Sequence, residues 1–129
     1  TGRLTWANAG HPPAWIVGAG LQTELSATGP LLSVLGGSWT NQQTRLDLDS
    51  RLLLWTDGLT ESHDGDRREL AEDGLAALVA DALATEQTSE GIVAHLLAAA
   101  RARAVDWRRD DVTCVAVRRT PTVASDTPS

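Results

Sequence analysis

Two short segments place carboxylate side chains at the ends of apolar runs. An apolar run at residues 52–55 is followed, after one threonine, by Asp57 and Gly58, and Asp110 and Asp111 stand immediately before a second apolar run. If the two runs form neighbouring antiparallel strands, the end of the first and the start of the second lie at the same edge of the sheet. Carboxylates that converge there repel one another unless a cation sits among them, and an all-oxygen set suits Mg²⁺ or Mn²⁺ rather than Zn²⁺. The pattern therefore predicts a metal site.

The same residues also have a simpler interpretation. Asp-Gly is a common turn pair, and adjacent aspartates are common in the solvated loops of proteins that bind no metal. Spacing alone leaves both interpretations open.

Five segments have the composition and periodicity of β-strands. Residues 3–9 and 14–17 predict two short strands of an opening meander, and the alternation at 43–48 predicts a half-buried strand. Residues 52–55 and 112–118 are apolar on both faces, which is typical of strands covered on both sides, and we expect the second to be central.

Two helices are predicted between the last two strands. Apolar residues recur at helical spacing within 75–83 and again within 92–100, and Thr88 or Ser89 provides an N-cap for the second helix. The Gly-, Ser- and Pro-rich residues 26–39 are expected to form a loop over the sheet edge. Together the elements predict an α+β fold in which two helices cover a largely antiparallel sheet.

Composition limits the class of protein. The chain has 129 residues, enough for one domain, with a net charge of -6 and a pI near 4.9, which argues against a nucleic-acid partner. The single cysteine, Cys114, is expected to be a small buried hydrophobe. No apolar stretch approaches the roughly 20 residues of a membrane span, and we expect no membrane association and a cytoplasmic location. The sequence has no Met, so we expect Thr1 to be a cut inside a longer protein.

Three blocks of sequence, taken in order, resemble the signatures of the PPM (protein phosphatase 2C-like) family in its SpoIIE-like bacterial branch. They are Ala-Asn-Ala-Gly-His-Pro-Pro at 7–13, Leu-Leu-Leu-Trp-Thr-Asp-Gly-Leu-Thr-Glu-Ser at 52–62 and Asp-Asp-Val-Thr-Cys-Val-Ala-Val-Arg at 110–118. Each block alone is weak, but the three together are specific. The resemblance covers roughly residues 3–119, and it implies that 1–119 form the C-terminal part of such a domain, followed by a disordered tail at 120–129.

The resemblance implies a fold and an activity. The fold would be a partial αββα sandwich, and the intact domain would hold two Mn²⁺ or Mg²⁺ ions that activate a water for attack on a phosphoserine or phosphothreonine. The substrate would be a phosphoprotein, and the branch suggests an anti-sigma factor antagonist. The chain would be the output end of a signalling protein.

The resemblance also assigns residues. Asp57 matches the metal ligand of the Thr-Asp-Gly block, and Asp110 matches the ligand that opens the Asp-Asp block. Asp111 and Gly58 are candidates for positions around these ligands, and Asp111 would hydrogen-bond a metal-bound water. We predict no catalytic residue beyond the metal ligands.

Other polar residues have competing interpretations. His11 pins a loop through its ring nitrogens or takes part in substrate binding or proton transfer, and Glu61 caps a turn or contacts a water near the metal. The stretch 63–66, which contains a histidine and two aspartates, is expected to be a solvated loop. Arg108 and Arg109 fit either phosphate attraction or surface charge.

The chain departs from the family pattern in two respects, of which one is His11, where eukaryotic relatives of the family carry an aspartate. The earlier block, in which an Asp of a Gly-Asp pair and a second Asp-Gly bridge both metals, has no match here, so we expect the chain alone to be inactive. The alternative function is a non-catalytic remnant or a protein-binding signalling module. A haloacid-dehalogenase-type phosphatase is excluded, because its second aspartate would stand at Leu59. Since half a sheet leaves edges unpaired, we expect the chain by itself to self-associate.

Overall fold

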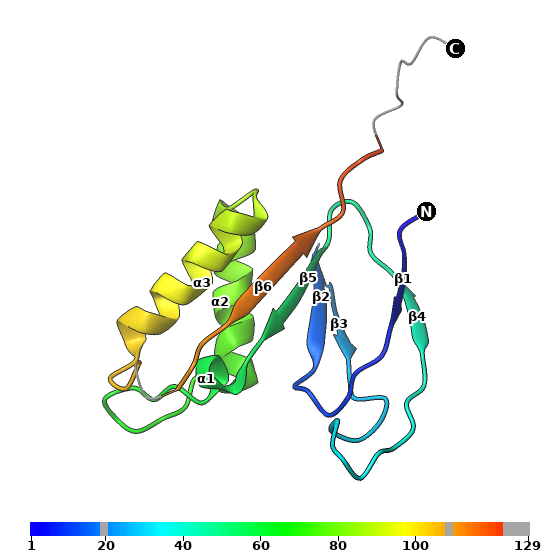
Figure 1. The fold of residues 1–129 in the computed structure, drawn as a ribbon. Coiled ribbons are helices and arrows are strands. Elements are labelled where there is room, and N and C mark those ends of the chain that lie inside the picture. The colour runs from blue at the N-terminus through cyan, green and yellow to red at the C-terminus, as the bar shows by residue number, and fades with distance from the viewer. Residues whose placement is uncertain (19–20, 108–109, 123–129) are drawn as a thin grey trace.

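The computed structural model describes residues 1–18, 21–107 and 110–122. Within these residues the chain forms a mixed α+β fold, drawn in Figure 1. No helix in the described ranges is long and apolar enough to cross a membrane. The elements in chain order are β1 (Arg3–Trp6), β2 (Ala14–Gly18), β3 (Leu21–Leu25), β4 (Gln42–Arg45), β5 (Arg51–Trp55), α1 (Asp57–Thr60), α2 (Ala71–Thr85), α3 (Ser89–Arg103) and β6 (Cys114–Arg118).

The elements are stacked in three layers (Figure 1). A four-stranded antiparallel sheet of order β3-β2-β5-β6 forms the middle layer, α2 and α3 cover one face, and the antiparallel pair β1-β4 lies over the other. Successive residues of β5 point to opposite faces, so Leu53 and Trp55 pack against the helices while Leu52 packs toward β1. The rings of Trp15 and Trp55 pack edge to face beneath the helical layer, with their centroids 4.5 Å apart. This arrangement confirms the predicted fold class.

The two long helices form where the apolar stripes predicted them. Thr88 caps α3, since its side chain accepts a hydrogen bond from the Gly91 N–H at 3.0 Å. The buried residues recur every three or four positions and are Leu75, Val79 and Ala82 in α2 and Ile92, Leu96 and Ala100 in α3.

The register of the sheet brings several strand ends to one edge. Trp55 at the end of β5 pairs with Cys114 at the start of β6, and Trp15 near the start of β2 pairs with Leu53. The turns after β5, before β6 and before β2 therefore lie together, at the end of the sheet where α1 begins; we call this end the α1 edge. The antiparallel pairing of β5 and β6, on which the predicted convergence depended, is confirmed.

Two sequence-based expectations about strands were wrong. β1 pairs with β4 rather than with β2, so the opening is not a meander, and β2 instead forms a hairpin with β3. β3 was missed because its apolar residues stand only at its ends. β6 is an edge strand of the described sheet rather than a central one: its second face carries Val115 and Val117, which are 44% and 41% exposed.

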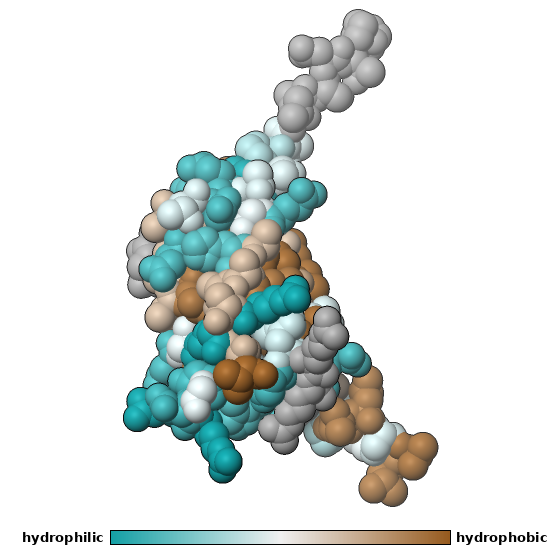
Figure 2. Space-filling model, turned by 90° about the vertical axis from the view of Figure 1, so that its left-hand side faces the viewer, coloured by the Kyte–Doolittle hydropathy of each residue, from teal (hydrophilic) through white to brown (hydrophobic). Residues whose placement is uncertain are grey.

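Two further predictions concern the loop at 26–39 and the tail at 120–129. Residues 26–39 contain no helix or strand, as predicted, but Leu31, Leu32, Val34 and Leu35 are 68–103% exposed rather than folded against the sheet. Figure 2 shows that hydrophilic residues dominate the face on the helical side, with hydrophobic side chains gathered in a few separate places. Residues 120–122 have no regular structure, and the rest of the expected tail lies outside the described residues.

Candidate metal centre

Thr56 joins the two aspartate-bearing segments at the α1 edge. Its backbone N–H donates to the Thr113 carbonyl at 3.0 Å, which extends the β5-β6 ladder by one step. Its hydroxyl donates to the Asp111 carbonyl at 3.2 Å and accepts from the Thr113 N–H at 2.9 Å. One side chain thus ties the end of β5 to the backbone before β6 at two points.

Gly58 permits the close approach of these segments. It is buried in α1, and a Cβ atom placed on it would collide with the Asp111 carbonyl oxygen and lie 2.9 Å from the Asp111 carbonyl carbon. Both neighbours are backbone atoms, so no side-chain rotation relieves the contact. Only glycine allows the turn after Asp57 to pack directly against the segment that begins at Asp110.

The proposed ligands flank this contact. Asp57 is exposed and begins α1, whose turn is closed by a hydrogen bond from the Glu61 N–H to the Asp57 carbonyl at 2.8 Å. Asp110 is exposed as well, and its Oδ1 accepts from the Asp111 N–H at 2.7 Å, which orients the carboxylate. Asp110 lines a cavity of about 300 Å³ together with Gly58 and Glu61. The predicted convergence is therefore seen in the backbone.

His11 lies at the same edge but around a different cavity. Its backbone N–H donates to Asn8 Oδ1 at 2.8 Å, and its exposed ring places Nδ1 3.0 Å from the Pro12 carbonyl oxygen. These local contacts agree with a loop-pinning role. The cavity beside it, of about 380 Å³, is mostly apolar and is bounded at this edge by Thr56 and Thr113.

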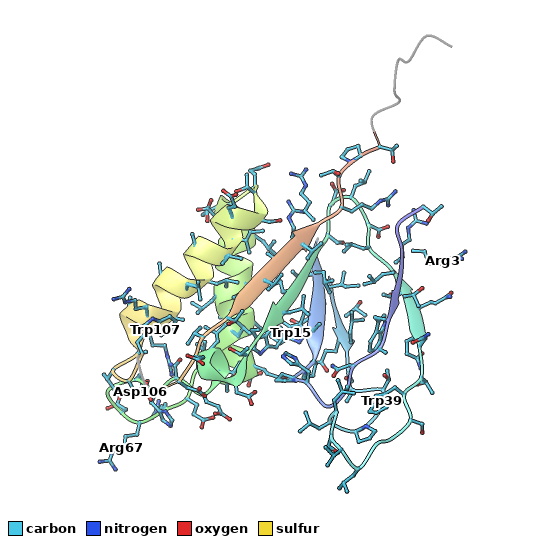
Figure 3. All side chains as sticks on the ribbon, in the orientation of Figure 1. Arg3, Trp15, Trp39, Arg67, Asp106 and Trp107 are labelled. Atoms are coloured by element: carbon cyan, nitrogen blue, oxygen red, sulfur yellow. The ribbon has the colours of Figure 1, made fainter. Side chains whose placement is uncertain are left out.

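A histidine-aspartate pair lies next to the candidate centre, and sequence reasoning missed it. Asp106 accepts from the His63 backbone N–H at 2.8 Å and lies 3.1 Å from His63 Nδ1. The backbone hydrogen bond from His63 is the main reason that the pKa of Asp106 is lowered. His63 and Asp106 line the same cavity as Asp110. Figure 3 shows Asp106 and Trp107 at the end of the molecule where α3 ends and α1 lies.

The stretch 63–66 is accordingly not a simple solvated loop. The His63 side chain is only 25% exposed, and Asp64 Oδ1 accepts from the backbone N–H groups of Asp66 and Arg68 at 2.9 and 3.0 Å. The prediction failed because the partner of His63 stands 43 positions away in sequence. The prediction for Arg108 and Arg109 lies outside the described residues.

The chemical type of the candidate ligands suits a hard cation, but there are too few of them to complete a site. Asp57 and Asp110 supply carboxylate oxygens, which Mg²⁺ and Mn²⁺ prefer. Among residues 1–18, 21–107 and 110–122, however, no group of three or more His, Cys, Asp or Glu side chains is arranged to hold a metal. Because Mg²⁺ prefers six ligands, two aspartates alone would not complete a site for it.

The fold and the α1 edge define a partial domain of the PPM phosphatase type. A family model described as Stage II sporulation protein E (SpoIIE) matches residues 1–120, and the chain belongs to that family. The resemblance drawn from the three sequence blocks is confirmed.

A solved structure is similar over nearly the whole chain. It is the crystal structure of the RsbU and RsbW domains of Rv1364c from Mycobacterium tuberculosis, with 27% sequence identity and a TM-score of 0.75. The match covers 95% of this chain and 35% of the other, so the chain spans about a third of the length of that protein. No curated protein matches the sequence.

Proposed function

We propose that this chain forms the part of a metal-dependent protein phosphatase that carries Asp57 and Asp110 as metal ligands. The proposal depends mainly on the close backbone contact of Gly58 with Asp111. The two hydrogen bonds of the Thr56 hydroxyl stabilise this contact. This contact joins the residues next to Asp57 and Asp110, on a chain that belongs to the SpoIIE family.

Each residue at the edge has a role in the proposal. Two Mn²⁺ or Mg²⁺ ions would lower the pKa of an attacking water and neutralise charge on the phosphoryl oxygens. Asp57 and Asp110 would hold the ions, and the Asp111 N–H orients the Asp110 carboxylate through its hydrogen bond. Glu61 and Asp111 would contact metal-bound water, and His11 would order the loop beside the centre. The remaining ligands come from outside the described residues.

The substrate is proposed from the same family relation. It is a phosphoserine or phosphothreonine protein of a sigma-factor pathway, an anti-sigma factor antagonist, since the similar structure combines an RsbU with an RsbW domain. The acidic chain, with a net charge of -6, disfavours a nucleic-acid substrate.

One observation favours a second function, that of a non-catalytic protein-binding module. The described residues contain no complete metal-ligand group, which is what a domain that had kept the fold without the chemistry would show.

Hydrolysis of a phosphoserine peptide with Mn²⁺ separates the two functions. The intact gene product, its Asp57→Asn and Asp110→Asn variants, and Asp81→Asn as a control on the exposed side of α2 are compared. The phosphatase proposal expects turnover in the parent and the control and its loss in both variants. Absence of turnover in the parent, with and without Mn²⁺ or Mg²⁺, would favour the binding module.

A further inference from the structure

A set of polar contacts ties the loop after α1 to the end of α3. Asp106 accepts from the backbone N–H of His63 at 2.8 Å and lies 3.1 Å from its ring Nδ1, while the Val105 N–H donates to the His63 carbonyl at 2.9 Å. Arg103, in the last turn of α3, donates to the Ser62 carbonyl at 3.2 Å and lies 3.5 Å from Asp64 Oδ2. We call His63, Asp64, Arg103 and Asp106 the clasp.

The side chains of the clasp are partly buried rather than fully exposed. The side chains of His63, Asp64, Arg103 and Asp106 are between 22% and 27% exposed. Ser62 is buried, and its side chain is bonded to the Leu59 carbonyl at 2.8 Å. Hydrogen bonds that involve charged groups at partly buried positions are stronger than those between neutral groups.

The clasp lies directly before the segment that carries Asp110. Asp106 stands four positions upstream of Asp110, and His63, Asp106 and Asp110 line the same cavity of about 300 Å³. Within the described part of the segment 104–113, the clasp therefore holds residues 105 and 106, and the Thr56 hydroxyl holds residues 111 and 113. In its described part this segment has no helix or strand to hold it otherwise.

We propose that His63 and Asp106 are positioning residues that set the place of Asp110 beside α1 and thereby raise the metal affinity of the α1 edge. The effect on metal affinity rests on the proposed function. The effect on the position of Asp110 concerns the protein without metal. Partners that orient metal ligands typically change affinity by about 10- to 100-fold.

Four variants of the intact gene product test the proposal. Asp106→Ala removes both contacts to His63. His63→Ala keeps the backbone contact but removes the ring contact to Asp106 and the one to Glu69, whose Oε1 lies 3.8 Å from His63 Nε2. His63→Asn keeps a side-chain donor near the position of Nδ1 and serves as the rescue. His95→Ala is the matched control, because that ring lies between α3 and α2, 3.5 Å from Thr85 Oγ1.

The first readout is amide hydrogen exchange without metal. Exchange at residues 104–107 and 110–112 should rise about tenfold or more in Asp106→Ala and less in His63→Ala, with β2, β5 and the two long helices unchanged. His63→Asn and His95→Ala should match the parent protein. Unchanged exchange in this segment, or an equal rise throughout the protein, would overturn the positioning role.

The second readout is the Kd for Mn²⁺ together with turnover at saturating Mn²⁺. The Kd should rise about tenfold in Asp106→Ala, and turnover should recover at saturation, because the clasp residues are not among the proposed metal ligands. If exchange rises while the Kd stays constant, the link to metal affinity is wrong although the phosphatase function stands. If the parent protein binds no Mn²⁺, the proposed function and the link fail together, while exchange still decides whether the clasp holds the segment.

Discussion

Replacement of Gly58 by alanine perturbs the contact that brings the two aspartate segments together. The added Cβ would overlap the Asp111 carbonyl oxygen and approach the Asp111 carbonyl carbon to 2.9 Å and Val112 Cγ2 to 3.2 Å. Since carbon atoms pack best at about 3.5 to 4.0 Å, the segment at Asp111 must move away by roughly 0.6 Å or more.

The size of the effect follows from three contributions. Overpacking of this kind costs about 1 to 3 kcal/mol. The shift also strains the two Thr56 hydroxyl bonds, each with a net contribution of about 1 kcal/mol. The higher helix propensity of alanine offsets at most about 1 kcal/mol, because α1 is a single turn. We expect Gly58→Ala to lower the free energy of unfolding by about 2 kcal/mol.

Urea unfolding measures this change, and the midpoint should fall by about 1 M. Gly65→Ala is the matched control, because a Cβ atom there has no heavy atom within 4 Å, and it should leave the midpoint unchanged or slightly raised. A Gly58→Ala protein that unfolds at the same or a higher urea concentration would show that the segment at Asp111 does not pack against α1.

Four further predictions concern other parts of the fold. The pKa of Asp106 is lowered in the folded protein, chiefly by the His63 N–H. The ionised carboxylate therefore stabilises the folded protein above its unfolded pKa of about 3.9, and this stabilisation is lost as the pH falls through the folded pKa. Asp106→Asn should make the free energy of unfolding depend less on pH in this window. Thr56→Val should destabilise the protein by about 1 to 2 kcal/mol in urea, while Thr56→Ser, which keeps the hydroxyl, should not. Burial raises the pKa of the Cys114 thiol to about 11, so an alkylating reagent at pH 8 should modify it much more slowly in the folded than in the urea-unfolded protein. The chain by itself should self-associate through the exposed face and edge of β6, and Val117→Lys should reduce its mass in light scattering; a monomeric parent chain would contradict this.

The sequence predicted those parts of the fold whose pattern is local. The apolar stripes of α2 and α3 and the Thr88 cap depend on residues a few positions apart, and they were found where expected. The approach of the segments that carry Asp57 and Asp110 was predicted on the condition that the two apolar strands are antiparallel neighbours, and the pairing of β5 with β6 meets that condition.

The parts that could not be predicted depend on distant contacts. The pairing of β1 with β4 crosses most of the first half of the chain, and no short-range signal distinguishes it from a meander. Val115 and Val117 have the composition of a central strand although they lie on an edge strand. The two hydrogen bonds of the Thr56 hydroxyl could not be predicted, because threonine is common at the end of a strand. Its partners, the Asp111 carbonyl and the Thr113 N–H, are identified only by the fold. His63 and Asp106 likewise give no joint pattern across 43 positions.

The central claim is that Asp57 and Asp110 hold the same metal centre, and a double-mutant cycle of Mn²⁺ binding tests it most directly. Titration calorimetry on the intact gene product would compare Asp57→Asn, Asp110→Asn and the double variant, with Asp81→Asn as the control. If both carboxylates serve one centre, each single variant loses most of the Mn²⁺ affinity and the double variant loses little more. If the single variants bind Mn²⁺ as the parent does, or if their losses simply add, the two aspartates do not share a metal centre.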